Sequence, residues 1–461
     1  MKKLPHALLG TLALASMTLA SQAAQAEESI SVWMTKGFYR AEDEALLAVA
    51  DRFYKKSGIK VELSLFSTED VVTKTVGAVS AGTPPDFAYG TSFNFATTGK
   101  WAYDGKLEDV SDVMIPLKDK FLPNTVETTY LYNDKAKKKA YYAAPIAQEI
   151  VHTFYWRDML KDAGYRDADI PKDWKGYWGF WCDKVQPALR AKGQRVYGIG
   201  QPTSVQANDT YYEFMSYINA YNVKLVDENG KLLLDDPKNR KNLELALADY
   251  VSVYQKGCTP PSSINWTAVD NNVNLHNRTT VMTPNSTLSI PGSYYDAMNS
   301  ATATPEQKEI ARKKYHETLV TARLPNKPDG TPLPSATAVK TAVIFADAKN
   351  KEGGKKFMAF LMQDMNLTPY LEGALGRYYP VTKSGAERPF WTDPSDPHRS
   401  AAHKMFTEGT IPYQFTYNWK FTTVNAENVW AQAMARIAKD NISPAQATDE
   451  MVARIKTIFA N

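Results

Sequence analysis

Ile30-Ser31-Val32-Trp33 is a short apolar run that predicts a β-strand, and residues 42–56 after it are amphipathic, as in a surface helix. That helix is expected to end at Ser57-Gly58, because glycine commonly follows the last helical turn. Ile59-Lys60-Val61-Glu62-Leu63 predicts a second strand, with a second helix after it. The two prolines of Ala81-Gly82-Thr83-Pro84-Pro85-Asp86-Phe87 mark a turn into a third strand. Strands that alternate with helices predict an α/β fold.

The first residues of the chain have the pattern of an export signal. Lys2 and Lys3 supply the positive start, and the apolar run over residues 8–20 is too short for a permanent membrane anchor. Ala24-Gln25-Ala26 is a small-x-small cleavage site. The sequence therefore predicts a signal peptide over residues 1–26 and a soluble, periplasmic mature chain that begins at Glu27.

Composition narrows the classes of partner. The 461 residues carry a formal charge of +4, or +2 once Lys2 and Lys3 are removed, so nothing favours nucleic acid as a partner. The length suggests two or more domains. Aromatic residues make up 12% of the chain, which suits both a carbohydrate site and a packed core. Cys182 and Cys258 could form a disulfide in an exported protein or remain separate buried thiols.

Further elements are expected along the rest of the chain. The Pro- and Gly-rich tract over residues 324–334 indicates irregular backbone. Residues 91–94 read as a loop after the third strand. Strands are predicted at residues 150–155, 232–234 and 339–345, and helices at 157–164, 242–255, 349–362 and 443–459.

A set of short motifs runs through nearly the whole mature chain. Each is weak alone, but their order and spacing resemble those of the bacterial family 1 extracellular solute-binding proteins, the capture subunits of ATP-driven sugar importers. The motifs are Gly105-Lys106-Leu107-Glu108-Asp109-Val110-Ser111-Asp112, Tyr141-Tyr142-Ala143-Ala144-Pro145, Arg157-Asp158-Met159-Leu160-Lys161-Asp162-Ala163-Gly164, Gly376-Arg377-Tyr378-Tyr379-Pro380-Val381 and Ser443-Pro444-Ala445-Gln446-Ala447.

The resemblance implies a two-lobed α/β periplasmic-binding-protein fold, in which each lobe has a mixed sheet flanked by helices and a hinge separates the lobes at a cleft. Chain crossings are expected near residues 145–148, 318–324 and 370–376. The N-terminal lobe would then comprise residues 27–146 and about 320–372, and the C-terminal lobe residues 147–319 and about 373–461.

Signals for catalysis, cofactors and metals are missing from the sequence. There is no Gly-x-Ser-x-Gly motif, no phosphate-binding glycine loop and no His-Glu-x-x-His pair. We therefore expect a protein that is not an enzyme and has no cofactor and no metal-binding site residues, while an ion such as calcium that supports a loop stays open. A periplasmic polysaccharide-active enzyme stays open as the competing class, because two carboxylates placed in a cleft would suffice for it.

Candidate ligand-binding residues follow from where the loops fall. Ligands of open α/β sheets lie beyond the carboxyl ends of the strands, so the loops after the first three strands should face the cleft. Trp33 could instead belong to the core, and Glu69 could instead stabilise the first turn of a helix with its negative charge. The candidates of the first lobe are Trp33, Lys36, Phe38, Glu69, Ser92 and Asn94.

The second group of candidates lies after the expected crossings. Arg377 offers a rigid donor fork to a diol or carboxylate, or it could form an interlobe salt bridge. Trp419 is a stacking platform for a sugar or a core residue. The candidates of this group are Gln148, Glu149, Trp266, Asn285, Arg377, Tyr378 and Trp419.

The resemblance implies a periplasmic substrate-binding component of an ABC importer. It would capture a mono- or oligosaccharide or a polyol and deliver it to permease subunits at the inner membrane, acting as a monomer. A glycerophosphodiester or a sugar acid, with Arg377 as its charge partner, is the alternative ligand.

Overall fold

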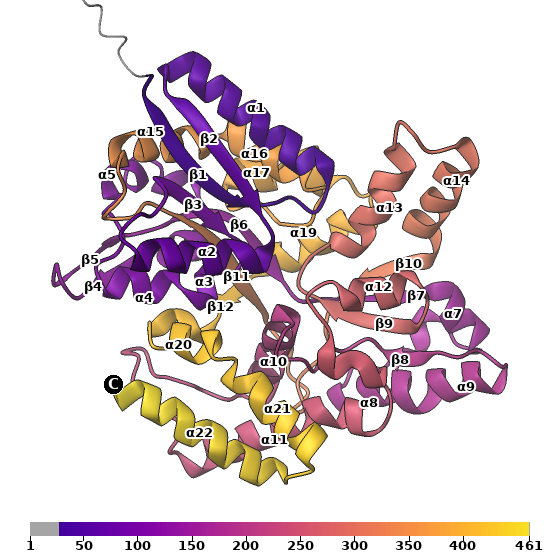
Figure 1. Ribbon diagram of the computed structural model, residues 1–461. Coiled ribbons are helices and arrows are strands. Elements are labelled where there is room, and N and C mark those ends of the chain that lie inside the picture. Colours follow the sequence, from indigo (N-terminus) through magenta and orange to yellow (C-terminus); the bar gives the residue numbers. More distant parts are fainter. Residues whose placement is uncertain (1–26, 461) are drawn as a thin grey trace, which may run out of the picture.

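Two β-sheets organise the chain in the computed structural model, which describes residues 27–460 (Figure 1). The predicted signal peptide lies outside the described residues. The larger sheet has the order β12-β11-β3-β1-β2, with β6 also paired to β11. Its strands are β1 (Ser29–Thr35), β2 (Lys60–Phe66), β3 (Phe87–Gly90), β6 (Ala144–Ile150), β11 (Ser335–Val343) and β12 (Thr410–Pro412).

The smaller sheet has the order β10-β7-β9-β8. Both sheets are mixed. In the larger sheet, β1 is parallel to β2 and β3, whereas β11 is antiparallel to β3 and β6. In the smaller sheet, β8 is parallel to β9, whereas β7 is antiparallel to β9 and β10. The strands are β7 (His152–Trp156), β8 (Tyr197–Ile199), β9 (Thr280–Asn285) and β10 (Leu319–Ala322), and a separate hairpin is formed by β4 (Tyr130–Asn133) and β5 (Lys138–Tyr141).

Helices surround both sheets. Those of the larger-sheet half are α1 (Arg40–Ser57), α2 (Thr68–Ser80), α3 (Phe93–Ala96), α4 (Thr98–Tyr103), α5 (Ser111–Met114), α6 (Pro123–Glu127), α15 (Lys351–Leu361) and α16 (Asp364–Gly373). The remaining helices are α7 (Arg157–Asp162), α8 (Trp174–Gly179), α9 (Gln186–Ala191), α10 (Asn208–Ala220), α11 (Pro237–Gln255), α12 (Asp270–His276), α13 (Ser289–Asn299), α14 (Pro305–Lys313), α17 (Lys383–Ala386), α18 (Pro389–Thr392), α19 (Arg399–Thr407), α20 (Phe421–Ala426), α21 (Val429–Asp440) and α22 (Pro444–Ala460).

The strand–helix alternation predicted at the N-terminus is confirmed from β1 to β3. Gly58 ends α1 with a positive φ of 73°, and its N–H donates to the Tyr54 carbonyl at 2.8 Å. Ser67 caps α2 by accepting from the Asp70 N–H at 3.0 Å. Alternate β1 residues Ile30, Val32 and Met34 are buried in the core beneath α1, α15 and α16, whereas α2 and α4 cover the other face of the sheet. The larger sheet is therefore enclosed by helices on both faces.

Three predictions on local structure are wrong. Residues 232–234 form no strand, and Leu232 only pairs with Val226 in an isolated bridge. The single strand expected at residues 150–155 is divided at Val151 between β6, in the larger sheet, and β7, in the smaller one. The expected loop at residues 91–94 already enters α3 at Phe93. In the second case, a continuous β-branched run hides the point where the chain changes sheets.

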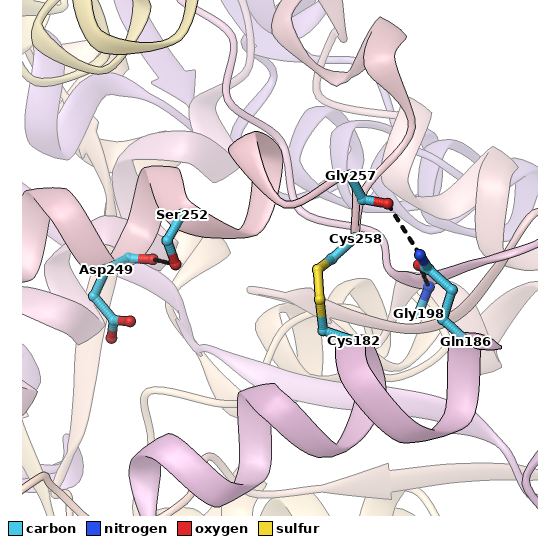
Figure 2. The surroundings of a disulfide bond; sticks show 7 residues. All are labelled: Cys182, Gln186, Gly198, Asp249, Ser252, Gly257 and Cys258. Atoms are coloured by element: carbon cyan, nitrogen blue, oxygen red, sulfur yellow. Dashed lines mark hydrogen bonds between the residues drawn. A yellow bond between two sulfur atoms is a disulfide. The ribbon is translucent and has the colours of Figure 1, made fainter. Parts of the chain in front are cut away.

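A disulfide that the sequence left open is present in the smaller-sheet half (Figure 2). Cys182, in a π-helical turn over Phe180–Val185, bonds to Cys258 after α11, with 5.1 Å between their Cα atoms. Beside it, the Gln186 side chain donates to the Gly257 carbonyl at 3.1 Å and accepts from the Gly198 N–H at 2.7 Å. These contacts tie the end of α11 to β8. Among residues 27–460, no helix combines the length and the apolar character that a membrane crossing requires.

Candidate functional site

The chain passes between the two sheets at Val151, and again over residues 323–334 between β10 and β11. At this junction β6 and β11 form an antiparallel ladder in which Glu149 is opposite Ala338 and Ala147 is opposite Lys340. Opposed residues lie on the same face of a sheet. Glu149 and Lys340 therefore share one face of the ladder.

A cavity of about 300 Å³, called here the central cavity, lies over that face, between the two halves of the molecule. Loops after β1, β2 and β3 form one wall, because the carboxyl ends of parallel strands meet at one edge of a sheet. The opposite wall comes from the loop after β9 and from the starts of α10, α12 and α13. The lining residues are Lys36, Gly37, Phe38, Ser67, Thr68, Glu69, Thr91, Ser92, Glu149, Asn208, Asp209, Tyr212, Ala268, Val269, Asn272, Asn285, Ser286, Thr287, Ser289, Lys340, Arg377 and Tyr378.

An ion pair forms the floor of the central cavity. Lys340 Nζ lies 2.6 Å from Glu149 Oε1, and the two side chains are only 3% and 4% exposed. The same ammonium donates to the Tyr212 hydroxyl at 2.9 Å. Burial raises the pKa of the Glu149 carboxyl and lowers the pKa of Lys340, and each charge offsets the shift of the other. The pair is therefore a fixed, mutually compensated part of the floor.

Arg377 is compensated in the same way by Glu42 of α1. Arg377 Nη1 lies 3.6 Å from Glu42 Oε2. The centre of the guanidinium lies 4.7 Å from the Tyr378 ring centroid and 5.3 Å from that of Phe38. Arg377 thus presents its donors to the cavity from a position fixed by one carboxylate and two rings.

An amide network holds the opposite wall. Asn285 donates to Asn272 Oδ1 at 2.6 Å, and Asn272 donates to Ser289 Oγ at 2.8 Å. Asn271 donates to Asp209 Oδ2 at 2.7 Å, and burial raises the pKa of Asp209 to about 7. Because the buried amides bond to one another, this wall keeps a defined shape without a ligand.

Two hydrogen bonds join the halves at the edges of the central cavity. The Tyr39 hydroxyl donates to the Ser289 carbonyl at 2.6 Å, and Asn208 Nδ2 donates to Ser92 Oγ at 3.0 Å. Each bond links a loop of the larger-sheet half to a helix start in the other half. The molecule is thus held with its walls close together around the cavity.

Comparison with known proteins identifies the family. Residues 48–401, more than half of the chain, match the family model described as bacterial extracellular solute-binding protein. The chain belongs to this family. No curated protein matches its sequence. The family description names solute binding, and the central cavity is one place where polar groups of both halves line a space between them.

Solved structures share the fold at low sequence identity. An ABC transporter solute-binding protein of Thermotoga lettingae TMO, bound to α-D-tagatose, superposes with a TM-score of 0.73 at 19% identity, over 94% of this chain and 99% of the other. Maltose-bound MalE3 of T. maritima gives 0.71 at 19% identity, over 93% and 99%. A ribitol complex from Agrobacterium radiobacter K84 gives 0.71 at 16% identity, over 94% and 98%. The predicted two-lobed periplasmic-binding-protein fold is confirmed.

Eight of the thirteen candidate residues line the central cavity. They are Lys36, Phe38, Glu69, Ser92, Glu149, Asn285, Arg377 and Tyr378. The other five lie elsewhere. Asn94 and Trp419 line a second cavity on another face of the molecule.

The remaining three candidates have partners in the protein interior. Trp33 packs edge-on against Phe66, with 5.4 Å between the ring centroids, on the α2 side of the larger sheet. Gln148 points to the opposite face of β6 from Glu149 and donates to the Pro380 carbonyl at 2.7 Å. Trp266 is 4% exposed, and its Nε1 donates to Ser262 Oγ at 3.1 Å.

Sequence reasoning missed several lining residues. Lys340 gave a usable signal, because it is a lone charge inside the apolar run from Thr337 to Val343. Asp209 gave none, since its partner Asn271 is 62 residues away. Among residues 27–460, no group of three His, Cys, Asp or Glu residues is placed to hold a metal ion.

Proposed function

We propose that this protein captures a neutral mono- or oligosaccharide or a polyol in the central cavity and delivers it to the permease subunits of an ABC importer. It would act in the periplasm as a monomer, after export by the signal at residues 1–26. The observation that carries the proposal is the composition of the cavity: hydrogen-bonding groups line both walls, and two of the three lining cations, Lys340 and Arg377, have carboxylate partners.

Charge balance favours an uncharged ligand. Three cations line the cavity, Lys36, Lys340 and Arg377, together with the carboxylates of Glu69, Glu149 and Asp209. Two of the cations already have carboxylate partners, Glu149 and Glu42. An anionic solute would therefore find little free positive charge, whereas sugar hydroxyls can bond to carboxylates, amides and a guanidinium alike. This argues against a sugar acid or a glycerophosphodiester.

The ligands of structurally similar proteins support the same class. α-D-Tagatose, maltose and ribitol are the ligands in the three complexes with this fold. All three are neutral polyhydroxylated molecules, so the fold at this size accommodates ligands of this class. The identity of the sugar depends on the lining side chains, which differ at identities of 16–19%.

Closure of the lobes would accompany binding. We propose lobe boundaries at the points where the chain changes sheets, near those expected from the sequence. The N-terminal lobe then holds residues 27–150 and about 335–372, and the C-terminal lobe residues 152–322 and about 373–460, with β12 of the latter segment paired to the larger sheet. A ligand that contacts both walls stabilises the arrangement in which they are close, in proportion to its differential affinity for the closed and open forms. The bonds from Tyr39 to Ser289 and from Asn208 to Ser92 are two of the interlobe contacts that would stabilise this closed form.

Glycoside cleavage is the second candidate function, because one observation favours it. Asp209, with its pKa near 7, has the proton affinity of a general acid, and Glu149 lines the same cavity. Asp209 is bonded to Asn271, however, and Glu149 to Lys340, so both carboxylates are held by structural partners. We expect no turnover of nitrophenyl glycosides, and measurable release of nitrophenol would favour the enzyme instead.

A thermal-shift screen tests the proposed function. The exported protein is heated with neutral mono- and oligosaccharides, polyols and sugar acids, and a ligand at 100 times its dissociation constant should stabilise the fold by about 2.7 kcal/mol. Phe38→Ala, at a 41% exposed lining residue, should weaken the response, whereas Tyr54→Leu, at a 43% exposed residue of α1 outside the cavity, should leave it unchanged. Stabilisation by sugar acids alone would contradict the proposal.

A further inference from the structure

A second cavity, of about 270 Å³, lies on the face of the β6–β11 ladder that is turned away from the central cavity. Thr337, Val339 and Thr341 of β11 line it, whereas Lys340 lines the central cavity. Successive side chains of a strand point to opposite faces. The ladder therefore separates the two cavities, which have no described lining residue in common.

Both halves of the molecule build the second cavity. One wall comes from α4 and the β4–β5 hairpin, and the other from the loop around Asn229, the turn at Gln414–Tyr417 and α20. Figure 1 shows α4, β4, β5 and α20 together on the left side of the molecule, away from α12 and α13, which flank the central cavity. The second cavity is thus a separate site and no extension of the first.

Aromatic rings dominate this cavity. Tyr103 and Trp419 stack across the two walls, with 4.0 Å between their centroids and 19° between their planes. Tyr130, Tyr132 and Tyr417 are 48%, 38% and 50% exposed, so much of each ring surface is in contact with water. Three exposed tyrosines around one cavity are more than core packing requires, and they offer ring faces to a ligand.

An exposed amide supplies a polar contact. Asn229 lines the second cavity, and its side chain is exposed. An asparagine amide both donates and accepts hydrogen bonds, and a sugar hydroxyl does the same. A sugar in this cavity can therefore bond to Asn229.

Charge completes the argument on ligand class. Lys139 is the charged residue that lines the cavity, and no carboxylate is among the described lining residues. The remaining polar lining groups are threonine hydroxyls and asparagine amides. Ring faces with neutral hydrogen-bonding groups suit a carbohydrate ring, whose C–H face stacks while its hydroxyls bond to the amides.

We propose that the second cavity is a binding site for a neutral carbohydrate ring, independent of the solute in the central cavity. The ring stacks on the exposed tyrosines, Tyr132 from β4 and Tyr417 from the opposite wall, and a hydroxyl bonds to the Asn229 amide. Because the walls belong to different halves, this site depends on the full chain being folded and on the position of the lobes.

Saturation-transfer NMR with maltose and methyl α-D-glucopyranoside tests this proposal. The variant Lys36→Ala/Phe38→Ala disables the central cavity, and the signal that it keeps reports on the second cavity. Adding Tyr132→Leu and Tyr417→Leu to this variant should reduce that signal at least fivefold. Asn229→Ala removes one hydrogen bond and should weaken the same signal at least twofold. Tyr54→Leu removes an exposed tyrosine of similar exposure from α1 and should change nothing. Circular dichroism melts confirm that each variant is folded.

Two results would overturn the second site. One is a signal that disappears with Lys36→Ala/Phe38→Ala and is unaffected by Tyr132→Leu/Tyr417→Leu, which would leave only the central cavity as a sugar site. The other is the absence of any signal from both probes with the unaltered protein. The reverse pattern, with signals sensitive only to the tyrosine variants, would support the second site while contradicting the proposed role of the central cavity.

Discussion

Tyr39 and Ser289 join the two halves of the molecule: the phenol hydroxyl donates to the serine carbonyl at 2.6 Å. Tyr39 precedes α1, and Ser289 is the first residue of α13. Burial raises the pKa of the Tyr39 phenol, so the hydroxyl keeps its proton and remains a donor at neutral pH. Gly292 makes this approach possible, because a Cβ atom there would overlap the Tyr39 hydroxyl. The contact is therefore a built-in part of the arrangement in which the two walls lie close together.

Tyr39→Phe should weaken sugar binding without unfolding the protein. One hydrogen bond contributes about 0.5–1.5 kcal/mol, which corresponds to roughly a 2- to 12-fold loss of affinity in isothermal titration calorimetry. Gly292→Ala should weaken binding as well, since its methyl group would displace the Tyr39 hydroxyl from the Ser289 carbonyl. Tyr54→Phe serves as the matched control. Unchanged affinity in both Tyr39→Phe and Gly292→Ala would show that the hydrogen bond from Tyr39 to Ser289 is not part of the ligand-bound form.

Breaking the ion pair on the cavity floor should be strongly destabilising. Lys340→Met leaves the Glu149 carboxylate buried without its partner, and removal of one member of a buried pair typically costs about 3–5 kcal/mol. The double variant Lys340→Met/Glu149→Gln should recover part of this loss, because it removes the uncompensated charge. Urea unfolding measures both free energies. Equal destabilisation by the single and double variants would mean that packing at Lys340, rather than charge, is what matters.

Asp209→Asn should stabilise the protein in a pH-dependent way. The folded protein holds the Asp209 proton up to about pH 7, whereas the unfolded chain loses it near 3.8. The tighter proton binding of Asp209 in the folded protein therefore contributes to stability fully below pH 4, and this contribution is lost as the pH rises to 7. Asparagine does not titrate. The free energy of unfolding of the variant should therefore exceed that of the native protein by up to roughly 4 kcal/mol at pH 8, and by little at pH 4. Urea unfolding of both proteins at the two pH values measures the difference, and an equal gain at both would contradict the assigned pKa.

Local sequence patterns predicted the elements of the N-terminal region well, because each depends on neighbouring residues. The apolar runs of β1 and β2, the amphipathic α1 and its terminal Gly58 are all readable within a few residues. Lys36, Phe38 and Glu69 were predicted for the same reason: each follows a strand of a parallel sheet, and such loops meet at one edge.

The sequence could not predict the face of the sheet to which a side chain points, or its partners from distant parts of the chain. Gln148 and Glu149 are adjacent, and only the pairing of β6 with β11 decides that Glu149 faces the central cavity. Trp33 belongs to the face of β1 that α2 covers, which depends on helices placed later in the chain. Asp209 depends on Asn271, and the second cavity combines residues from 94 to 422, so neither leaves a local pattern.

Loss of the Cys182–Cys258 bond should lower stability and leave sugar binding intact. The two cysteines are 76 residues apart, and closing a loop of that length stabilises a folded chain by about 4 kcal/mol in the chain-entropy model. The variant Cys182→Ser/Cys258→Ser should therefore unfold at a lower urea concentration than the native protein. Native protein treated with a reductant should show the same shift. Neither cysteine lines the central cavity, so calorimetric affinity measured well below the melting temperature should match that of the native protein. A large loss of affinity in the folded variant would show that the disulfide also positions the wall formed by α10 and β9.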